Sequence, residues 1–109
     1  MTRYQLKINA ENLPRGLIRR PNPYAVVTVT GGPRLGETLG KTDVVFNTVD
    51  PDFAKTLFLE TDSSVFMPIR VAICNDRNDA HLAEANFEAT EVHVSRGRMQ
   101  ERLLPKGAK

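Results

Sequence analysis

Hydrophobic and polar residues alternate along much of the chain, which is the pattern of β-strands that bury one face. The first such segment covers residues 4–10, where Tyr4, Leu6 and Ile8 alternate with polar residues. A second segment, residues 24–30, is rich in β-branched residues and stops at a Gly-Gly-Pro turn. Five further segments are predicted as strands by the same reasoning, over residues 41–46, 53–59, 68–74, 82–89 and 99–104.

The alternation also assigns side chains to the faces of these strands. In the third segment, Thr42, Val44 and Phe46 are expected on one side. In the fifth segment the alternating aliphatic residues are expected to point inward, so Cys74 is expected to point outward. The segment 82–89 contains several alanines and glutamates, so a helix is an open alternative there.

Short strands separated by Gly, Pro, Ser and Asn predict an all-β fold, an antiparallel Greek-key sandwich of about seven strands. An α/β fold would need crossover helices, and the connections are too rich in turn-forming residues to supply them. The chain has 109 residues, close to the commonest domain size. We therefore expect one domain over residues 1–109.

The long connection at residues 11–23 is the most unusual segment of the chain. It contains three arginines around an apolar pair, namely Arg15, Leu17, Ile18, Arg19 and Arg20. A solvated loop is the ordinary explanation of such a charge run. However, apolar side chains ringed by cations are also what an interfacial membrane anchor requires. We call residues 15–20 the arginine loop, and membrane docking is the favoured interpretation.

Composition restricts the remaining choices. Hydrophobic residues make up 40% of the chain, charged residues 26%, and the net charge is +2, so a globular domain is expected and disorder is not. No stretch approaches the roughly 20 apolar residues of a membrane span, and the first ten residues lack a signal-peptide core. A single cysteine excludes an internal disulfide. These features predict a soluble, cytoplasmic chain.

Catalysis has little support in the sequence. Cys74, His81 and His93 are the only cysteine and histidines, and no spacing places either histidine beside the thiol. No phosphate-binding glycine motif or metal-ligand spacing occurs, so no cofactor and no metal are expected. The aromatic residues do not form a stacking platform, so nucleic-acid binding is not expected either.

Four segments, in this order, resemble the C2 domain, an eight-stranded sandwich used mostly for membrane docking. They are an opening strand with an Ala-x-x-Leu exit at 6–13, the Asn-Pro-Tyr strand start at 22–27, the segment from Lys-Thr to Asp-Pro-Asp-Phe at 41–53, and Leu-Ala-Glu-Ala at 82–87. The second and third segments are most similar to C2 domains of HECT-type ubiquitin ligases. The resemblance implies a calcium site between the first and third loops, built from aspartates.

The residues at those positions depart from the family pattern. Asn22 stands for the aspartate before Pro-Tyr, while Asn75 and Arg77 align with the first two aspartates of the third loop. Calcium requires several clustered oxygen ligands, and Asp76 and Asp79 are too few to replace those lost. The sequence therefore predicts a calcium-independent domain.

The resemblance also places Arg77 and His81 in a loop beside the arginine loop, although His81 alone would more simply be a surface histidine. The expected function is docking to an anionic phospholipid surface, with peripheral membrane association. The expected lipid-binding residues are Arg15, Leu17, Ile18, Arg19, Arg20, Arg77 and His81. The alternative is a protein-interaction or regulatory module, of a ubiquitin ligase if the subfamily resemblance holds.

The C-terminus departs from the family as well, since a further strand normally follows the position of Gly107. A missing last strand would leave backbone donors and acceptors unpaired along a sheet edge. Such an edge would allow two copies of the chain to pair as a homodimer.

Overall fold

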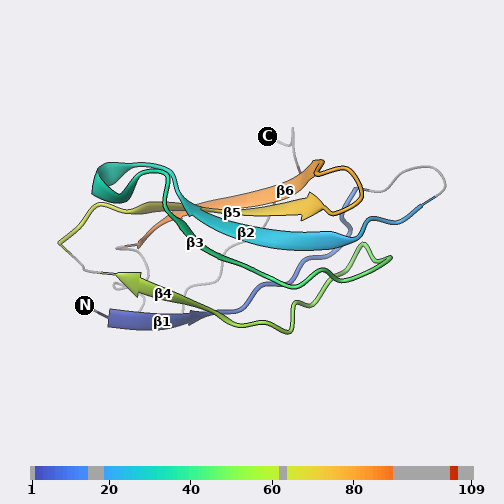
Figure 1. Cartoon of the computed structure of the whole chain (residues 1–109), viewed down its shortest axis with the longest axis horizontal. Helices are drawn as coiled ribbons and strands as arrows, with labels where there is room; N and C mark the ends of the chain where they lie inside the picture. The colour runs from blue at the N-terminus through green and yellow to red at the C-terminus, as the bar shows by residue number, and fades with distance from the viewer. Residues whose placement is uncertain (1, 15–18, 62–63, 90–103, 106–109) are drawn as a thin grey trace.

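The strands form two packed layers in the computed structural model, which describes residues 2–14, 19–61, 64–89 and 104–105 (Figure 1). The described elements are β1 (Thr2–Leu6), β2 (Pro23–Val29), the 3-10 turn η1 (Gly32–Arg34), β3 (Thr38–Lys41), β4 (Leu57–Thr61), β5 (Pro68–Asn75), β6 (His81–Glu88) and β7 (Leu104–Pro105). No helix in the described part of the chain has the length and hydrophobicity needed to cross a bilayer.

One layer is a five-stranded sheet in the order β3-β2-β5-β6-β7, and the other pairs β1 with β4. All described pairings are antiparallel, so the predicted all-β antiparallel sandwich is confirmed. The central pair, β2 and β5, is in register over its whole length, from Pro23 opposite Asn75 to Val29 opposite Ile69. Connections at both ends of the sandwich begin or end at these two central strands.

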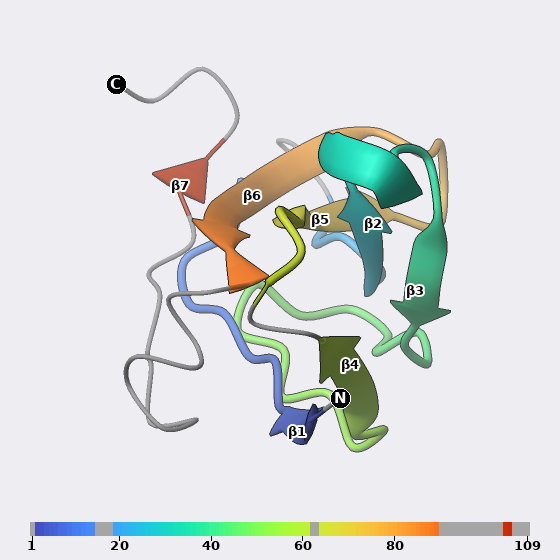
Figure 2. The same ribbon diagram turned by 90° about the vertical axis from the view of Figure 1, so that its left-hand side faces the viewer.

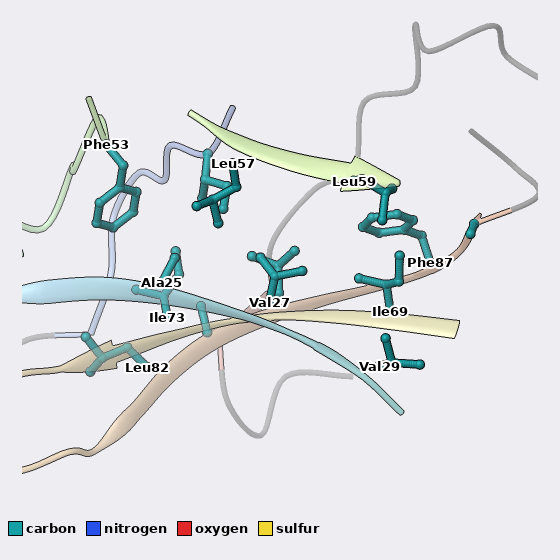
Figure 3. Packing of buried hydrophobic residues seen from close by; sticks show 14 of the residues in the cluster. Ala25, Val27, Val29, Phe53, Leu57, Leu59, Ile69, Ile73, Leu82 and Phe87 are labelled. Carbon is teal, nitrogen blue, oxygen red and sulfur yellow. The ribbon is translucent and has the colours of Figure 1, made fainter. Parts of the chain in front are cut away.

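The core lies between the two layers. Leu57 and Leu59 of β4 point toward the five-stranded sheet, where Ile69 and Val27 face them (Figure 3). All four side chains are almost fully buried. Each such side chain stabilises the fold by roughly 1.5–3 kcal/mol relative to an exposed position. The apolar alternation along the strands therefore supplies the energy that holds the layers together.

The ambiguous segment 82–89 forms a strand, not a helix. β6 pairs with β5 from Ile69 opposite Phe87 to Ile73 opposite Ala83, and its alternate residues are buried. Pairing with β5 and burial of one face in the core outweigh the high helix propensity of alanine and glutamate. As predicted, Cys74 follows the fully buried Ile73 and lies on the outer face.

The third predicted strand differs from the structure. β3 ends at Lys41, and Thr42 is buried whereas Phe46 is exposed, so the two do not lie on one side of a strand. Thr42 donates its backbone N–H to the Ala25 carbonyl (2.9 Å), as in a regular strand pair. The Ala25 N–H, however, donates to the side-chain hydroxyl of Thr42 (2.8 Å) and not to its backbone carbonyl. The side chain thereby replaces a backbone group in the ladder, regular strand pairing ends, and Phe46 falls in the connection that follows.

Other strand limits also shift. β1 ends at Leu6, although an isolated bridge from Asn9 to Asp52 continues the pairing toward the predicted end. The strand predicted at 53–59 forms as β4, which starts later. Of the strand predicted at 99–104, Leu104 lies in β7, whereas residues 99–103 lie outside the described residues.

The edges of the two sheets bear on the predicted homodimer. β7 covers part of the outer edge of β6, opposite Ala83 and Glu84 (Figure 2). Within the described residues, β1 pairs with β4 alone, so its other edge has no partner strand. Gly107 and its neighbours lie outside the described residues. Edge-to-edge pairing of two copies therefore stays a prediction.

Candidate functional site

Three connections meet at one end of the sandwich: the described residues 10–14 and 19–22 of the first connection, residues 42–52 and the turn at residues 76–80. β2 begins and β5 ends at this end, as the antiparallel pairing of Pro23 with Asn75 requires. Figure 1 shows these connections together at the right of the molecule. We call this end the loop end. The connection through η1 lies at the opposite end.

Asn22 joins the three connections. Its side-chain carbonyl accepts hydrogen bonds from the backbone N–H of Asn47 (2.8 Å) and from Nη2 of Arg77 (3.3 Å). Its own backbone N–H donates to the side-chain carbonyl of Asn75 (3.0 Å). Asn22 is 8% exposed, and a polar group buried this far needs such partners. The amide therefore acts as a structural hub for the loop end.

Arg77 is held beside this hub by hydrogen bonds from its side chain and its backbone. Its Nε donates to the backbone carbonyl of Arg20 (3.4 Å), and its backbone N–H donates to the Asn75 side chain (3.2 Å). The structure thus brings Arg77 beside the arginine loop. The guanidinium binds the Asn22 oxygen, one of the groups that the family resemblance assigns to a calcium site. A fixed cation therefore lies between the first and third connections.

The two stems of the arginine loop are fastened to the connection at residues 42–52. On one side, the Leu13 N–H donates to the Val49 carbonyl (2.9 Å). On the other side, the Thr48 N–H donates to the Pro21 carbonyl (3.0 Å). These backbone bonds keep both stems at the loop end, where the described chain stops at Pro14 and resumes at Arg19.

The predicted lipid-binding residues have different positions. Arg19, Arg20 and Arg77 are exposed at the loop end. His81 begins β6 on the outer face of the sheet, and its Nε2 lies 3.7 Å from Oε1 of Glu84. It therefore faces a carboxylate on its own strand. Arg15, Leu17 and Ile18 lie outside the described residues.

Carboxylates at the loop end are dispersed. Asp50 accepts the backbone N–H of Asn12 (2.8 Å), and Asp79 accepts the hydroxyl of Tyr24 (3.0 Å). Asp76 is exposed on the turn. Within the described ranges, no group of three or more acidic, histidine or cysteine side chains has metal-binding geometry. The arrangement lacks the clustered oxygens that calcium prefers.

Cys74 and His81 are cross-strand partners, a proximity that the sequence spacing did not reveal. However, burial raises the pKa of the Cys74 thiol, so little of the nucleophilic thiolate is present near neutral pH. His93, the remaining candidate base, lies outside the described residues. The environment of Cys74 therefore gives no support to nucleophilic catalysis.

Tyr24 should make stability depend on pH above neutrality. Burial, aided by the hydrogen bond to Asp79, raises the pKa of Tyr24 from 10.0 to about 12. Because the folded chain favours the neutral phenol, this stabilisation is complete below pH 10 and is lost as pH rises toward 12. We expect the unfolding free energy to fall over that interval in urea titrations. Tyr24→Phe should lose about 1 kcal/mol and flatten the slope, whereas an unchanged slope would contradict this account.

Two features of the loop end escaped the sequence reasoning. The hub role of Asn22 depends on partners 25 and 55 positions away, which no local pattern reveals. The exposure of Phe46 was not predicted, because alternation alone placed it on the same side of a strand as Thr42, which is buried. Asn47, which follows it, has a positive φ of 54°. Asparagine tolerates that conformation, so it was the available signal that the strand ends before Phe46.

Comparisons with known proteins agree with this architecture. A family model for the C2 domain matches residues 6–104. Human GIVD cytosolic phospholipase A2, in complex with methyl gamma-linolenyl fluorophosphonate, superposes with a TM-score of 0.70 and 19% identity over 83% of this chain. The chain covers 13% of that phospholipase. BON1-C2B superposes with a TM-score of 0.60 and 19% identity, covering 94% of this chain and 83% of BON1-C2B. No curated protein sequence matches.

Proposed function

The chain belongs to the C2 domain family, which generally binds membranes, and on this premise we propose that it docks to anionic phospholipid without calcium. It acts as a non-catalytic, peripheral membrane module. The docking surface is the loop end, with the exposed Arg19 and Arg20 beside Arg77 and with Arg15, Leu17 and Ile18 in the same loop. The bond from Arg77 to the Arg20 backbone, which gathers cations from two connections at one end, is the observation that carries the proposal.

The energies favour weak, reversible docking. Each arginine near an anionic surface contributes roughly 1 kcal/mol. A fully inserted leucine or isoleucine adds at most about 1.5–3 kcal/mol. Exposed acids such as Asp76 reduce the electrostatic part. Lasting residence at a membrane would therefore require multivalency or a second attachment in the same protein.

The contacts at the hub support the proposed calcium independence. The side-chain oxygens of Asn22 and Asn75 already accept hydrogen bonds from backbone N–H groups. The Arg77 guanidinium is bound to one of these oxygens and would repel a divalent cation. A calcium ion would have to displace these hydrogen-bond donors. The ligands that it would gain are neutral amide oxygens, which bind it more weakly than carboxylates do.

Vesicle co-sedimentation with and without calcium tests the proposal. We expect binding to phosphatidylcholine vesicles that contain phosphatidylserine, equal in calcium and in chelator, and little binding to phosphatidylcholine alone. Calorimetric titration should show no micromolar calcium site, and calcium should not raise the melting temperature. Binding that appears in calcium alone, or a stoichiometric isotherm, would overturn calcium independence. A failure to bind anionic vesicles under either condition would overturn membrane docking.

A protein-interaction module is the second candidate function. Leu35 and Phe66 are 69% and 60% exposed at the end of the sandwich opposite the loop end. Gly32 packs closely against Phe66, so this residue lies beside the turn at η1 that precedes Leu35. If the resemblance to HECT-type ligases holds, the partner would be a catalytic domain. Absence of vesicle binding would favour this candidate.

A further inference from the structure

Phe46 is an exposed aromatic residue at the loop end. Its exposed fraction is 71%, the largest among the large hydrophobic side chains of the described residues. Most phenylalanines of a small domain contribute to its core, and leaving this one in water forfeits the free energy of burial. An aromatic ring kept in solvent at a proposed docking surface is therefore a candidate contact residue.

The backbone around Phe46 is fixed, so the exposure of the ring is built into the fold. The preceding residue, Val45, donates its N–H to the Pro23 carbonyl (2.9 Å). The following residue, Asn47, donates its N–H to the Asn22 side chain (2.8 Å). Asn47 also has a positive φ of 54°, so the chain turns directly after Phe46.

The other exposed phenylalanines have partners within the fold. The Arg3 guanidinium lies 3.9 Å from the ring centroid of Phe58. Phe66 contacts the backbone turn at Gly31 and Gly32. Among the described residues, no cation or aromatic group stacks on the Phe46 ring. Its contact surface is thus free for another molecule.

The occupant is inferred from the charges beside the ring. The segment that pairs with the Phe46 loop, residues 21–23, directly follows Arg19 and Arg20, which are exposed. Arginine side chains bind lipid phosphates, while an aromatic ring prefers the boundary between headgroups and acyl chains. We propose that Phe46 is a second apolar anchor, which inserts into the lipid interface beside the arginine loop. This inference rests on the proposed membrane docking and adds a contact from a different connection.

A single tryptophan can report the insertion directly, because the chain contains none. In Phe46→Trp, vesicles of phosphatidylcholine and phosphatidylserine should shift the fluorescence to shorter wavelength, and brominated acyl chains should quench it. Phe66→Trp, at the opposite end, is the matched control and should show neither change. If Phe46→Trp co-sediments with vesicles but its spectrum and quenching stay at solution values, Phe46 is no anchor, although membrane docking stands.

Removal of the ring gives a second measurement. Phe46→Ala should weaken partitioning onto the same vesicles about tenfold, with the same ratio at low and high salt, because the lost contact is apolar. Phe66→Ala should bind as the parent chain does. Unchanged partitioning of Phe46→Ala would contradict the anchor. If the parent chain itself does not sediment with these vesicles, the proposed docking fails, and the anchor with it.

Discussion

Replacement of Arg19 and Arg20 together by glutamate should lower vesicle binding about a thousandfold. Each arginine contributes roughly 1 kcal/mol near an anionic surface, and reversal of its charge replaces attraction with similar repulsion. The two reversals together cost about 4 kcal/mol, which corresponds to roughly three orders of magnitude in the partition coefficient. Co-sedimentation over a series of phosphatidylserine contents measures this change.

The control for this double variant is Arg19→Lys with Arg20→Lys, which keeps both charges and should bind nearly as the parent chain does. The fold should tolerate either pair of substitutions, because both side chains are exposed and the bond from Arg77 to Arg20 is accepted by the backbone carbonyl of Arg20. Added salt should weaken parent binding by screening the charges. If the glutamate variant binds like the parent, the membrane contact lies elsewhere on the domain.

Asn22→Leu should destabilise the folded chain by about 1–2 kcal/mol. The substitution keeps the branched shape and the number of side-chain heavy atoms but leaves the backbone N–H of Asn47 and Nη2 of Arg77 without their acceptor. Asn47 and Arg77 are themselves exposed, so water can reach these donors and each lost bond costs about 1 kcal/mol. For a domain of this size, the melting temperature should fall by roughly 5–10 degrees. Urea unfolding measures the free energy.

Asn22→Asp distinguishes the effect of losing the hydrogen-bond acceptor from the effect of changed packing around residue 22. The carboxylate keeps an oxygen toward Asn47 and adds an attraction to Arg77, so stability should remain close to that of the parent chain. Equal stability of the leucine variant and the parent would show that the hub bonds do not hold the loop end together. A similar loss in the leucine and aspartate variants would assign the effect to packing around Asn22.

The local pattern of residues determined which segments become strands and which side chains they bury. Alternation along residues 68–74 indicated the correct inward face, because side chains of a strand point alternately to its two sides. Turn-forming residues between the segments predicted an antiparallel sandwich. The arginine-rich connection could also be recognised from the sequence, since residue composition and the positions of turn-forming residues are local properties.

The tertiary structure alone decided where strands end and which loops meet. β3 stops at Lys41 because the Thr42 hydroxyl accepts the N–H of Ala25, a contact across 17 positions. Phe46 lies in the connection that follows β3 and is exposed. The hub at Asn22 depends likewise on Arg77, which is distant in sequence and adjacent only when β2 and β5 pair. Hydrogen bonds between segments that are far apart carry no local signature, so the alternation that predicted the strands could not predict the loop end.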